Sequence, residues 1–312
     1  MSSAAVIAIA LLIDVVCGWP DWLYRRIGHP VSWAGKLVDA LEGLLNRGPR
    51  GRRIVTGAVT VVLVLVAATI PAIVIQIALP SGPVAWIVGG ILAWPLIAAR
   101  SLHDHVKAVA IPLESGDIEA ARGQVSKIVG RDPASLDSSA ISRASIESLA
   151  ENSSDGVVAP VFWGVVAGLP GIVAYKMINT MDSMIGHRSE RFEAFGKVAA
   201  RVDDVVNLIP ARLSAGLLAL ASGPKASKAF SVTFQDARNH RSPNAGWPES
   251  ALAGALGIRL SGPRKYADHV VGEPWLNADA PDPSAGDIYR ALALYKRMVA
   301  LLALVLLGLA LV

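Results

Sequence analysis

Charged side chains are scarce in this chain of 312 residues, of which 17% are charged. Soluble globular domains carry about 25% charged residues. The shortage is uneven, because residues 54–99 contain no charged side chain, and a helix that crosses a bilayer needs about 20 apolar residues. A link with Pro and Gly at 79–83 divides this run, which predicts a transmembrane hairpin with spans near 54–79 and 84–99. A buried hairpin in a large soluble domain is the alternative, although lipid satisfies the same pattern without surrounding protein.

Cysteine is also nearly absent, since Cys17 is the only one. An intrachain disulfide and a Cys-based zinc site are therefore excluded. The chain has no GxxxxGK[ST] loop, so a bound ATP would need an uncommon phosphate site. It also lacks the GxSxG and HExxH motifs of many hydrolases. No basic helix or aromatic stacking platform accompanies the net charge of +4, so nucleic acid is not an expected partner.

Further apolar stretches predict more membrane segments. Residues 4–18 form a first span without the basic start and cleavage site of a signal peptide, and residues 291–312 form a last one. Weaker spans at 156–175 and 205–223 contain prolines, and broken helices are tolerated at membrane depth where they line a cavity. Hydropathy leaves open whether these two cross fully. We expect an all-α, polytopic membrane helical bundle, a single membrane domain over 1–312, with cytoplasmic helices and broken or re-entrant helices.

Basic residues in short loops predict the orientation. Residues 21–53 hold seven Lys or Arg against three acids, and loops rich in Lys and Arg stay on the cytoplasmic side. We expect a multi-pass protein of the cell (inner or plasma) membrane, with cytoplasmic polar segments at 100–155 and 224–290 and an active site that faces the cytoplasm.

Four polar clusters lie beside or within the apolar stretches. Ionisable groups near lipid are costly, so they usually face an interior cavity and serve a function. Carboxylates and amides suit Mg²⁺, which prefers oxygen ligands, and arginines grip phosphate. The clusters are Glu151, Asn152 and Asp155; Asn179, Asp182 and Arg188; Asp203, Asp204 and Asn207, followed by Arg212; and, within 236–250, Asp236, Arg238, Asn239, His240, Arg241, Asn244 and Glu249.

Each cluster also has a purely structural interpretation. Asp203 and Asp204 would suit the solvated first turn of a helix, where the helix dipole favours acids. Glu151 would suit an ion pair with Arg143 or Lys176. Glu151 and Asp155 are four apart, so an uninterrupted α-helix would place both on one face.

Four spaced motifs resemble the adenosylcobinamide-phosphate synthase family of cobalamin biosynthesis, also called the CobD/CbiB family. The resemblance is clearest over 138–265, and HPV (29–31) and LEGLLN (41–46) extend it toward the N-terminus. One departure is visible: the family usually has Gly-Asp-Pro near the end of the first span, whereas this chain has Gly18, Trp19 and Pro20. The motifs are ESLAENSSDGVVAPVFW, YKMINTMDSMIGHRSERF, ARVDDVVNLIPARLSA and DARNHRSPNAGWPESALAGALGIRL.

The resemblance implies an ATP-dependent amide ligase. Such an enzyme joins the propionate carboxylate of adenosylcobyric acid, a corrinoid, to (R)-1-amino-2-propanol or its O-phosphate. On this hypothesis Asp182, Asp203 and Asp204 hold Mg²⁺, and Glu151 or Asp155 orients or deprotonates the amine, so Glu151, Asp155 and Asp182 are the catalytic residues. The remaining predicted residues bind substrates: Asn152, Asn179, Arg188, Asn207, Arg238, Asn239, His240, Arg241, Asn244 and Glu249, with the arginines on phosphate groups.

Two other functional classes remain as alternatives. A magnesium-dependent membrane alcohol phosphotransferase or prenyltransferase also places Asp clusters at helix ends, but usually as matching pairs on two helices. A non-catalytic transporter would suit broken helices, although no inverted repeat is visible. Whether the amine arrives phosphorylated, and whether the protein forms homo-oligomers or complexes with other enzymes of the cobalamin pathway, stays open.

Overall fold

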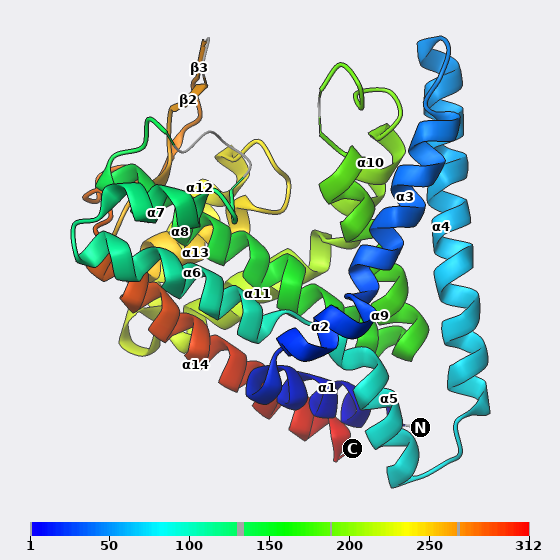
Figure 1. Ribbon diagram of the computed structural model, residues 1–312. Helices are drawn as coiled ribbons and strands as arrows, with labels where there is room; N and C mark the ends of the chain where they lie inside the picture. The colour runs from blue at the N-terminus through cyan, green and yellow to red at the C-terminus, as the bar shows by residue number, and fades with distance from the viewer. Residues whose placement is uncertain (1, 130–133, 188, 267–268, 312) are drawn as a thin grey trace. The chain divides into compact units, whose positions relative to one another are not determined.

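The computed structural model describes residues 2–129, 134–187, 189–266 and 269–311, which are mostly helical (Figure 1). The prediction of an all-α bundle with broken helices is therefore confirmed. Within these described ranges, four stretches are long and apolar enough to cross a membrane: Arg50–Ala78, Pro83–Glu114, Ser138–Ile185 and Ala285–Ala310. Two more pairs of helices, Ser3–Cys17 with Asp21–Leu45 and Lys197–Val206 with Leu208–Ala221, would qualify if each pair were one broken span.

The chain forms two compact units, each assembled from separate stretches of sequence. The first contains Met1–Ala98, Ala159–Asn207 and Val305–Val312, and the second contains Ala99–Val158 and Leu208–Leu304. The helices of the first unit are α1 (Ser3–Cys17), α2 (Asp21–Ile27), α3 (Pro30–Leu45), α4 (Arg50–Ala78), α5 (Pro83–Ala93), α9 (Ala159–Ile185) and α10 (Lys197–Val206).

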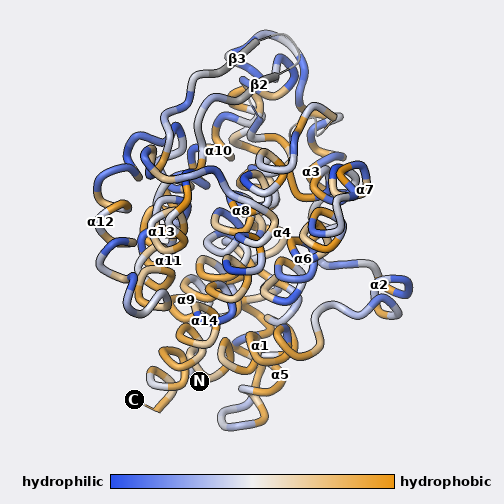
Figure 2. Tube along the Cα trace, turned by 90° about the vertical axis from the view of Figure 1, so that its left-hand side faces the viewer, coloured by the Kyte–Doolittle hydropathy of each residue, from blue (hydrophilic) through white to orange (hydrophobic). Residues whose placement is uncertain are grey.

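The core of the first unit lies where α3, α4, α9 and α10 pack together. Val38, Val64, Met181 and Phe195 are all buried there. Gly57 allows the closest approach, because a Cβ at this position would lie 1.9 Å from the carbonyl oxygen of Phe195. In the same unit α1 packs against α5 and α9. Figure 2 shows α1 and α5 as hydrophobic along most of their length, whereas α2 is largely hydrophilic.

A break inside α9 follows from its GLPG sequence. Gly168 has a φ of 65°, which only glycine adopts without strain, and Pro170 has no N–H to donate. The side chain of Gln76 on α4 compensates for the lost helical bonding, because its Oε1 accepts a hydrogen bond of 2.8 Å from the N–H of Leu169. The helix break is thus held by one polar side chain from an otherwise apolar segment.

In the turn after α1, Trp19 stands where the Gly-Asp-Pro pattern of the resembled family has an acid. The helices on either side of it, Ser3–Cys17 and Asp21–Leu45, are bent by 109°, and Gly18 has a φ of 58°. The Trp19 ring packs edge-on against His29 and beside Trp94, and Trp94 Nε1 donates to the Gly18 carbonyl at 3.1 Å. An aromatic cluster therefore stabilises this turn.

The second unit is built around one helix within residues 224–290. The sequence predicted only a polar segment there and did not indicate this helix. Gly246–Leu256, α13, is buried along almost its whole length and packs against α8, α11 and α12. Its small residues explain the close packing, since a Cβ on Gly254 would lie 2.9 Å from the Cα of Ala229. The other helices are α6 (Ala99–Glu114), α7 (Ile118–Val125), α8 (Ser138–Ser153), α11 (Leu208–Ala221), α12 (Ala226–Asp236) and α14 (Ala285–Ala310).

Two short antiparallel strand pairs complete the second unit. Strands β1 (Leu260–Ser261) and β4 (Trp275–Leu276) pair with each other, as do β2 (Arg264–Tyr266) and β3 (His269–Val271). The chain beside β4 is fixed by Asn277, whose N–H donates to Asp236 Oδ2 at 2.7 Å and whose side-chain amide donates to the Ile258 carbonyl at 3.0 Å.

Candidate functional site

A buried chain of hydrogen bonds in the first unit orients one of the predicted metal ligands. The hydroxyl of Tyr175 on α9 donates to Asn207 Oδ1 at 3.0 Å, and Asn207 Nδ2 donates to Asp203 Oδ2 at 2.9 Å. Tyr175, Asn207 and Asp203 are exposed by 2%, 1% and 9%. Both ends of the Asn207 amide are therefore occupied by protein groups, which indicates that Asn207 positions Asp203.

The acids of α10 do not lie in the first turn of a helix. Asp203 and Asp204 belong to the last turn of α10, which ends at Val206. The interpretation of a solvated N-terminal turn is therefore wrong. A carboxylate gains nothing from the helix dipole at a C-terminal turn, and Asp203 is also buried. Its position instead depends on the hydrogen bond from Asn207.

A third carboxylate lies close to this pair. Asp182, near the end of α9, is close enough to Asp204 for their charges to repel each other. A Cβ on Gly186 would lie 2.0 Å from Asp182 Oδ1, so only glycine leaves room for that carboxylate. Among the described residues, no three or more His, Cys, Asp or Glu side chains form a group that could hold a metal ion. Mg²⁺ needs only one or two carboxylates, because it keeps waters and binds phosphate oxygens.

The other predicted residues of this region are less constrained. Asn179 Oδ1 accepts a long hydrogen bond of 3.4 Å from Lys176 Nζ, one helical turn away on α9. Arg188, predicted to bind phosphate, lies outside the described residues.

The acidic segment 151–155, which leads into the apolar run 156–175, changes from α-helical to π-helical geometry after Ser153. α8 ends at Ser153, and residues 154–158 form a π-helical turn that leads into α9. The spacing of an α-helix therefore does not run unbroken from Glu151 to Asp155. Glu151 and Asn152 are exposed, and the amide of Asn152 donates to the Ser148 carbonyl at 2.9 Å. π-turns of this kind are frequent at functional sites.

Arg212 in the second unit contacts both an aromatic ring and a side-chain amide. Its guanidinium carbon lies 4.4 Å from the centre of the Trp247 ring, and Nη1 donates to Asn244 Oδ1 at 3.1 Å. It is also close enough to Arg238 for the two charges to repel each other. Within the described part of the chain, neither arginine forms an ion pair with a carboxylate, and such an arrangement favours an anionic ligand.

The remaining predicted residues near 236–250 are held by neighbours in the same unit. Arg241 pairs with the buried Glu273 at 3.1 Å, so its charge is balanced. His240 Nε2 lies 3.8 Å from Glu249 Oε2, and both side chains are almost fully buried. The N–H of Ser242 donates to His240 Nδ1 at 3.0 Å. Asn239 is exposed. Arg238 is thus the member of this set best suited to bind an external phosphate.

Comparison with known proteins identifies the relatives of this chain. The family model described as CobD/Cbib protein matches residues 7–295. A protein of Rhodobacter capsulatus named cobalamin biosynthesis protein CobD is 57% identical, over 98% of this chain and 97% of its own length. Relatives of the same name from Sinorhizobium fredii and Brucella anthropi are 47% and 45% identical, over 96% and 95% of this chain and 94% of their own lengths. No solved structure matches the chain.

The chain belongs to the CobD/CbiB family. The resemblance inferred from the four motifs is therefore confirmed. In this CobD/CbiB protein the predicted residues fall into two groups: Asn179, Asp182, Asp203, Asp204 and Asn207 in the first unit, and Glu151, Asn152, Asp155, Arg238, Asn239, His240, Arg241, Asn244 and Glu249 in the second.

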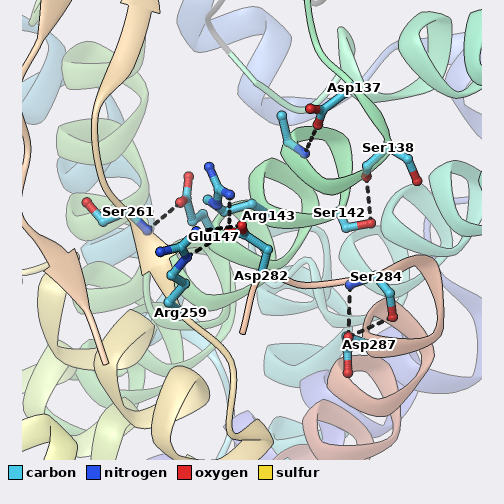
Figure 3. A network of polar contacts seen from close by, with 11 residues as sticks. Asp137, Ser138, Ser142, Arg143, Glu147, Arg259, Ser261, Asp282, Ser284 and Asp287 are labelled. Atoms are coloured by element: carbon cyan, nitrogen blue, oxygen red, sulfur yellow. Dashed lines mark hydrogen bonds and ion pairs between the residues drawn. The ribbon is translucent and has the colours of Figure 1, made fainter. Parts of the chain in front are cut away.

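Several polar residues of this CobD/CbiB protein that form ion pairs or hydrogen bonds were not among the predicted site residues. Arg143 on α8 pairs with Asp282, not with Glu151 as one interpretation proposed. Arg259 pairs with the same carboxylate at 2.6 Å, and this hydrogen-bonded pairing holds the pKa of Asp282 below its usual range. Glu147 accepts a hydrogen bond of 2.7 Å from the N–H of Ser261 (Figure 3). The sequence carried no signal for these contacts, because the partners are 23 to 139 residues apart.

The first unit also contains a polar pocket of about 670 Å³ that the sequence did not indicate. Arg191 donates two hydrogen bonds to Glu42, at 2.9 and 2.6 Å, and Asn46 Nδ2 donates to the same carboxylate at 2.7 Å. Arg53 Nε donates to Asn46 Oδ1 at 2.7 Å. Because the Glu42 carboxylate balances the charge of Arg191, we interpret this network as structural support for the segment that follows α9.

Proposed function

We propose that this protein is an ATP-dependent amide ligase of cobalamin biosynthesis. It would join the propionate carboxylate of adenosylcobyric acid to (R)-1-amino-2-propanol or its O-phosphate, forming adenosylcobinamide or its phosphate. The observation that carries the proposal is the 57% identity, over 98% of the chain, to a protein named cobalamin biosynthesis protein CobD. The apolar helices fit an enzyme of the cell membrane whose active site faces the cytoplasm.

The proposed reaction needs two steps. A carboxylate oxygen of the corrinoid attacks the γ-phosphorus of ATP, the bond to ADP breaks, and an acyl phosphate forms. The neutral amine nitrogen then attacks the acyl carbon, phosphate leaves, and the nitrogen loses a proton. The protein has to hold three reactants in place and stabilise phosphoryl charge. Positioning and electrostatic stabilisation are the two effects expected to contribute most to the rate acceleration.

In the first unit, the proposed task is to bind Mg²⁺. The nearby carboxylates of Asp182 and Asp204 and the oriented carboxylate of Asp203 are oxygen donors of the type that Mg²⁺ prefers. A bound Mg²⁺ would neutralise phosphate charge. Asn207, first predicted to bind substrate, takes the role of orienting Asp203, because both ends of its amide are occupied.

In the second unit, the proposed task is to hold phosphate and handle the amine. Arg238 and Arg212 supply two positive charges that no carboxylate within the described ranges balances, which suits a phosphate group. Glu151 and Asp155 are the proposed acceptors of the amine proton, with Asn152 and Asn244 as partners for corrinoid amides. The other residues of the 236–250 cluster would hold Arg238 and Asn244 in place: Arg241, Asn239, His240 and Glu249.

The proposal is tested with the purified protein, ATP, Mg²⁺, adenosylcobyric acid and the amine. ADP release should require both the corrinoid and the amine, and mass spectrometry should detect the amide product. Aminopropanol and its O-phosphate are compared as separate substrates. Asp182→Asn should lower the ligation rate by about 100-fold, as expected for loss of one charge-stabilising group.

A matched control is Asp39→Asn, which removes an exposed acid on α3 in the same unit and should leave the rate unchanged. ADP release without corrinoid, or an unchanged rate in Asp182→Asn, would contradict the proposed roles. Complete absence of product with either amine would contradict the ligase itself.

A further inference from the structure

A second pocket lies in the second unit and is lined by none of the predicted site residues. Its volume is about 300 Å³, and it is formed by the segment after α11, the end of α13 and the middle of α14. Ala255, Leu256 and Leu294 supply an apolar part of the wall. Lys225, Arg290 and Arg297 supply the charged part. The pocket therefore combines an apolar surface with positive charge.

Two of the three cations in this pocket are not balanced by the protein. Arg290 is held, because it pairs with Asp287 and its Nη2 donates to the Leu256 carbonyl at 2.6 Å. Lys225 and Arg297 are exposed, and neither forms an ion pair within the described ranges. Among the residues that the structure describes, no acidic one lines the pocket. An anion that entered it would meet two uncompensated positive charges.

The position of the pocket along α14 indicates which kind of anion the pocket would bind. Arg297 is the last charged residue of the chain, and residues 298–310 continue α14 as an uninterrupted apolar segment. Lys225 follows the apolar helix α11 in the same way. Cations at the ends of apolar helices lie where hydrocarbon meets the headgroup layer. Leu220 and Leu304 on these two helices are exposed by 58% and 65%, so apolar surface continues from the pocket.

We propose that this pocket binds the phosphate headgroup of an anionic phospholipid. Lys225 and Arg297 contact the phosphate, and the apolar wall of Ala255, Leu256 and Leu294 contacts the first carbons of the lipid. Basic pockets between membrane helices are recognised binding places for such headgroups. A free phosphate can meet the same two cations but gains nothing from the apolar wall, so binding of the lipid is stronger. The proposal does not depend on the ligase activity.

The test uses the full-length protein in a neutral detergent and follows its thermal unfolding midpoint. The protein is titrated with phosphatidylglycerol, with neutral phosphatidylcholine and with inorganic phosphate. Phosphatidylglycerol should raise the midpoint, and the other two additions should not. Lys225→Gln or Arg297→Gln should each raise the half-saturating lipid concentration about fivefold, and the double variant about 25-fold, from the attraction expected for each basic residue near an anionic surface.

Matched controls exist within three residues of each cation. Lys228 and Lys296 are exposed and do not line the pocket, so Lys228→Gln and Lys296→Gln change the net charge equally. If these controls weaken lipid binding as much as the pocket variants do, diffuse surface charge explains the effect and the pocket is not a site. If inorganic phosphate stabilises the protein with the same loss in the variants, the ligand is a free phosphate and the lipid proposal is overturned. Arg297→Lys keeps the charge, so it should retain binding if the fold is intact.

Discussion

At the scale of single residues, the hydrogen bonds of Asn207 indicate that its side chain positions Asp203. From the sequence it is one polar residue beside two acids, equally suited to substrate or structure. In the fold it is 1% exposed and fully engaged between Tyr175 and Asp203. The ionised Asp203 carboxylate can only accept hydrogen bonds, so it faces the amide nitrogen, and the amide oxygen is left to accept from the Tyr175 hydroxyl.

We predict that Tyr175→Phe weakens the response of the enzyme to Mg²⁺. Loss of the hydroxyl lets the Asn207 amide turn, and Asp203 then loses its oriented donor. The Mg²⁺ concentration for half-maximal ligation should rise about tenfold, the lower end of the effects seen for partners of metal ligands. It is measured by titrating Mg²⁺ at saturating ATP, corrinoid and amine.

Ser183→Ala is the control for Tyr175→Phe, because the Ser183 hydroxyl is on the same helix and donates only to the Asn179 carbonyl, at 2.8 Å. Its Mg²⁺ response should match the wild type. An effect of Tyr175→Phe on thermal stability alone, with an unchanged Mg²⁺ response, would reduce Tyr175 to a packing role.

At the scale of secondary-structure elements, Asp282 joins two parts of the second unit that are far apart in sequence. It receives hydrogen bonds from Arg143 on α8 and from Arg259 after α13, and both guanidinium groups lie over the Trp275 ring, at 4.6 and 4.2 Å from its centre. Strand β4 is thereby attached to α8. These bonds favour the charged carboxylate, with the one from Arg259 as the main cause of its lowered pKa.

We predict that this junction weakens in acid. Because the pKa of Asp282 is lower in the folded than in the unfolded chain, its contribution is complete above the unfolded value of about 3.9 and is lost as the pH falls through the folded pKa. Asp282→Asn should cost about 1 kcal/mol at neutral pH, since the group is 38% exposed and its charge is screened by solvent. The difference from the wild type should shrink below about pH 4.

The measurement is thermal unfolding from pH 3 to 7. Asp279→Asn, an exposed acid three residues earlier in the chain, is the control and should leave the curve unchanged. A difference for Asp282→Asn that stays constant down to pH 3 would show that the carboxylate charge is not what holds the junction.

At the scale of the whole molecule, the distribution of basic residues predicts the direction of insertion. The link between α3 and α4 contains Arg47 and leads into Arg50, Arg52 and Arg53, whereas the link after α4, residues 79–82, carries no charge. Basic loops remain in the cytoplasm. If α4 crosses the membrane, these two links lie on opposite sides.

We predict opposite labelling of single cysteines in these two links. Cys17 is first replaced by serine, which leaves a chain without cysteine. A membrane-impermeant maleimide added to intact cells should then label Ser81→Cys but not Gly48→Cys, and both should be labelled in opened membranes. Labelling of Gly48→Cys in intact cells would reverse the predicted orientation and with it the cytoplasmic site.

The sequence by itself determined the fold class and the family. Long uncharged runs suffice for the fold class, because a bilayer imposes length and hydropathy on each helix, and the four spaced motifs carry the family. The break at the GLPG motif in α9 was also visible, since Gly and Pro act through the local backbone. Only the tertiary structure decided that Gln76 holds this break, that Asn207 serves Asp203, that Arg143 pairs with Asp282, and that α13 is buried. Those contacts join residues distant in sequence, and neither periodicity nor spacing specifies which distant groups will meet.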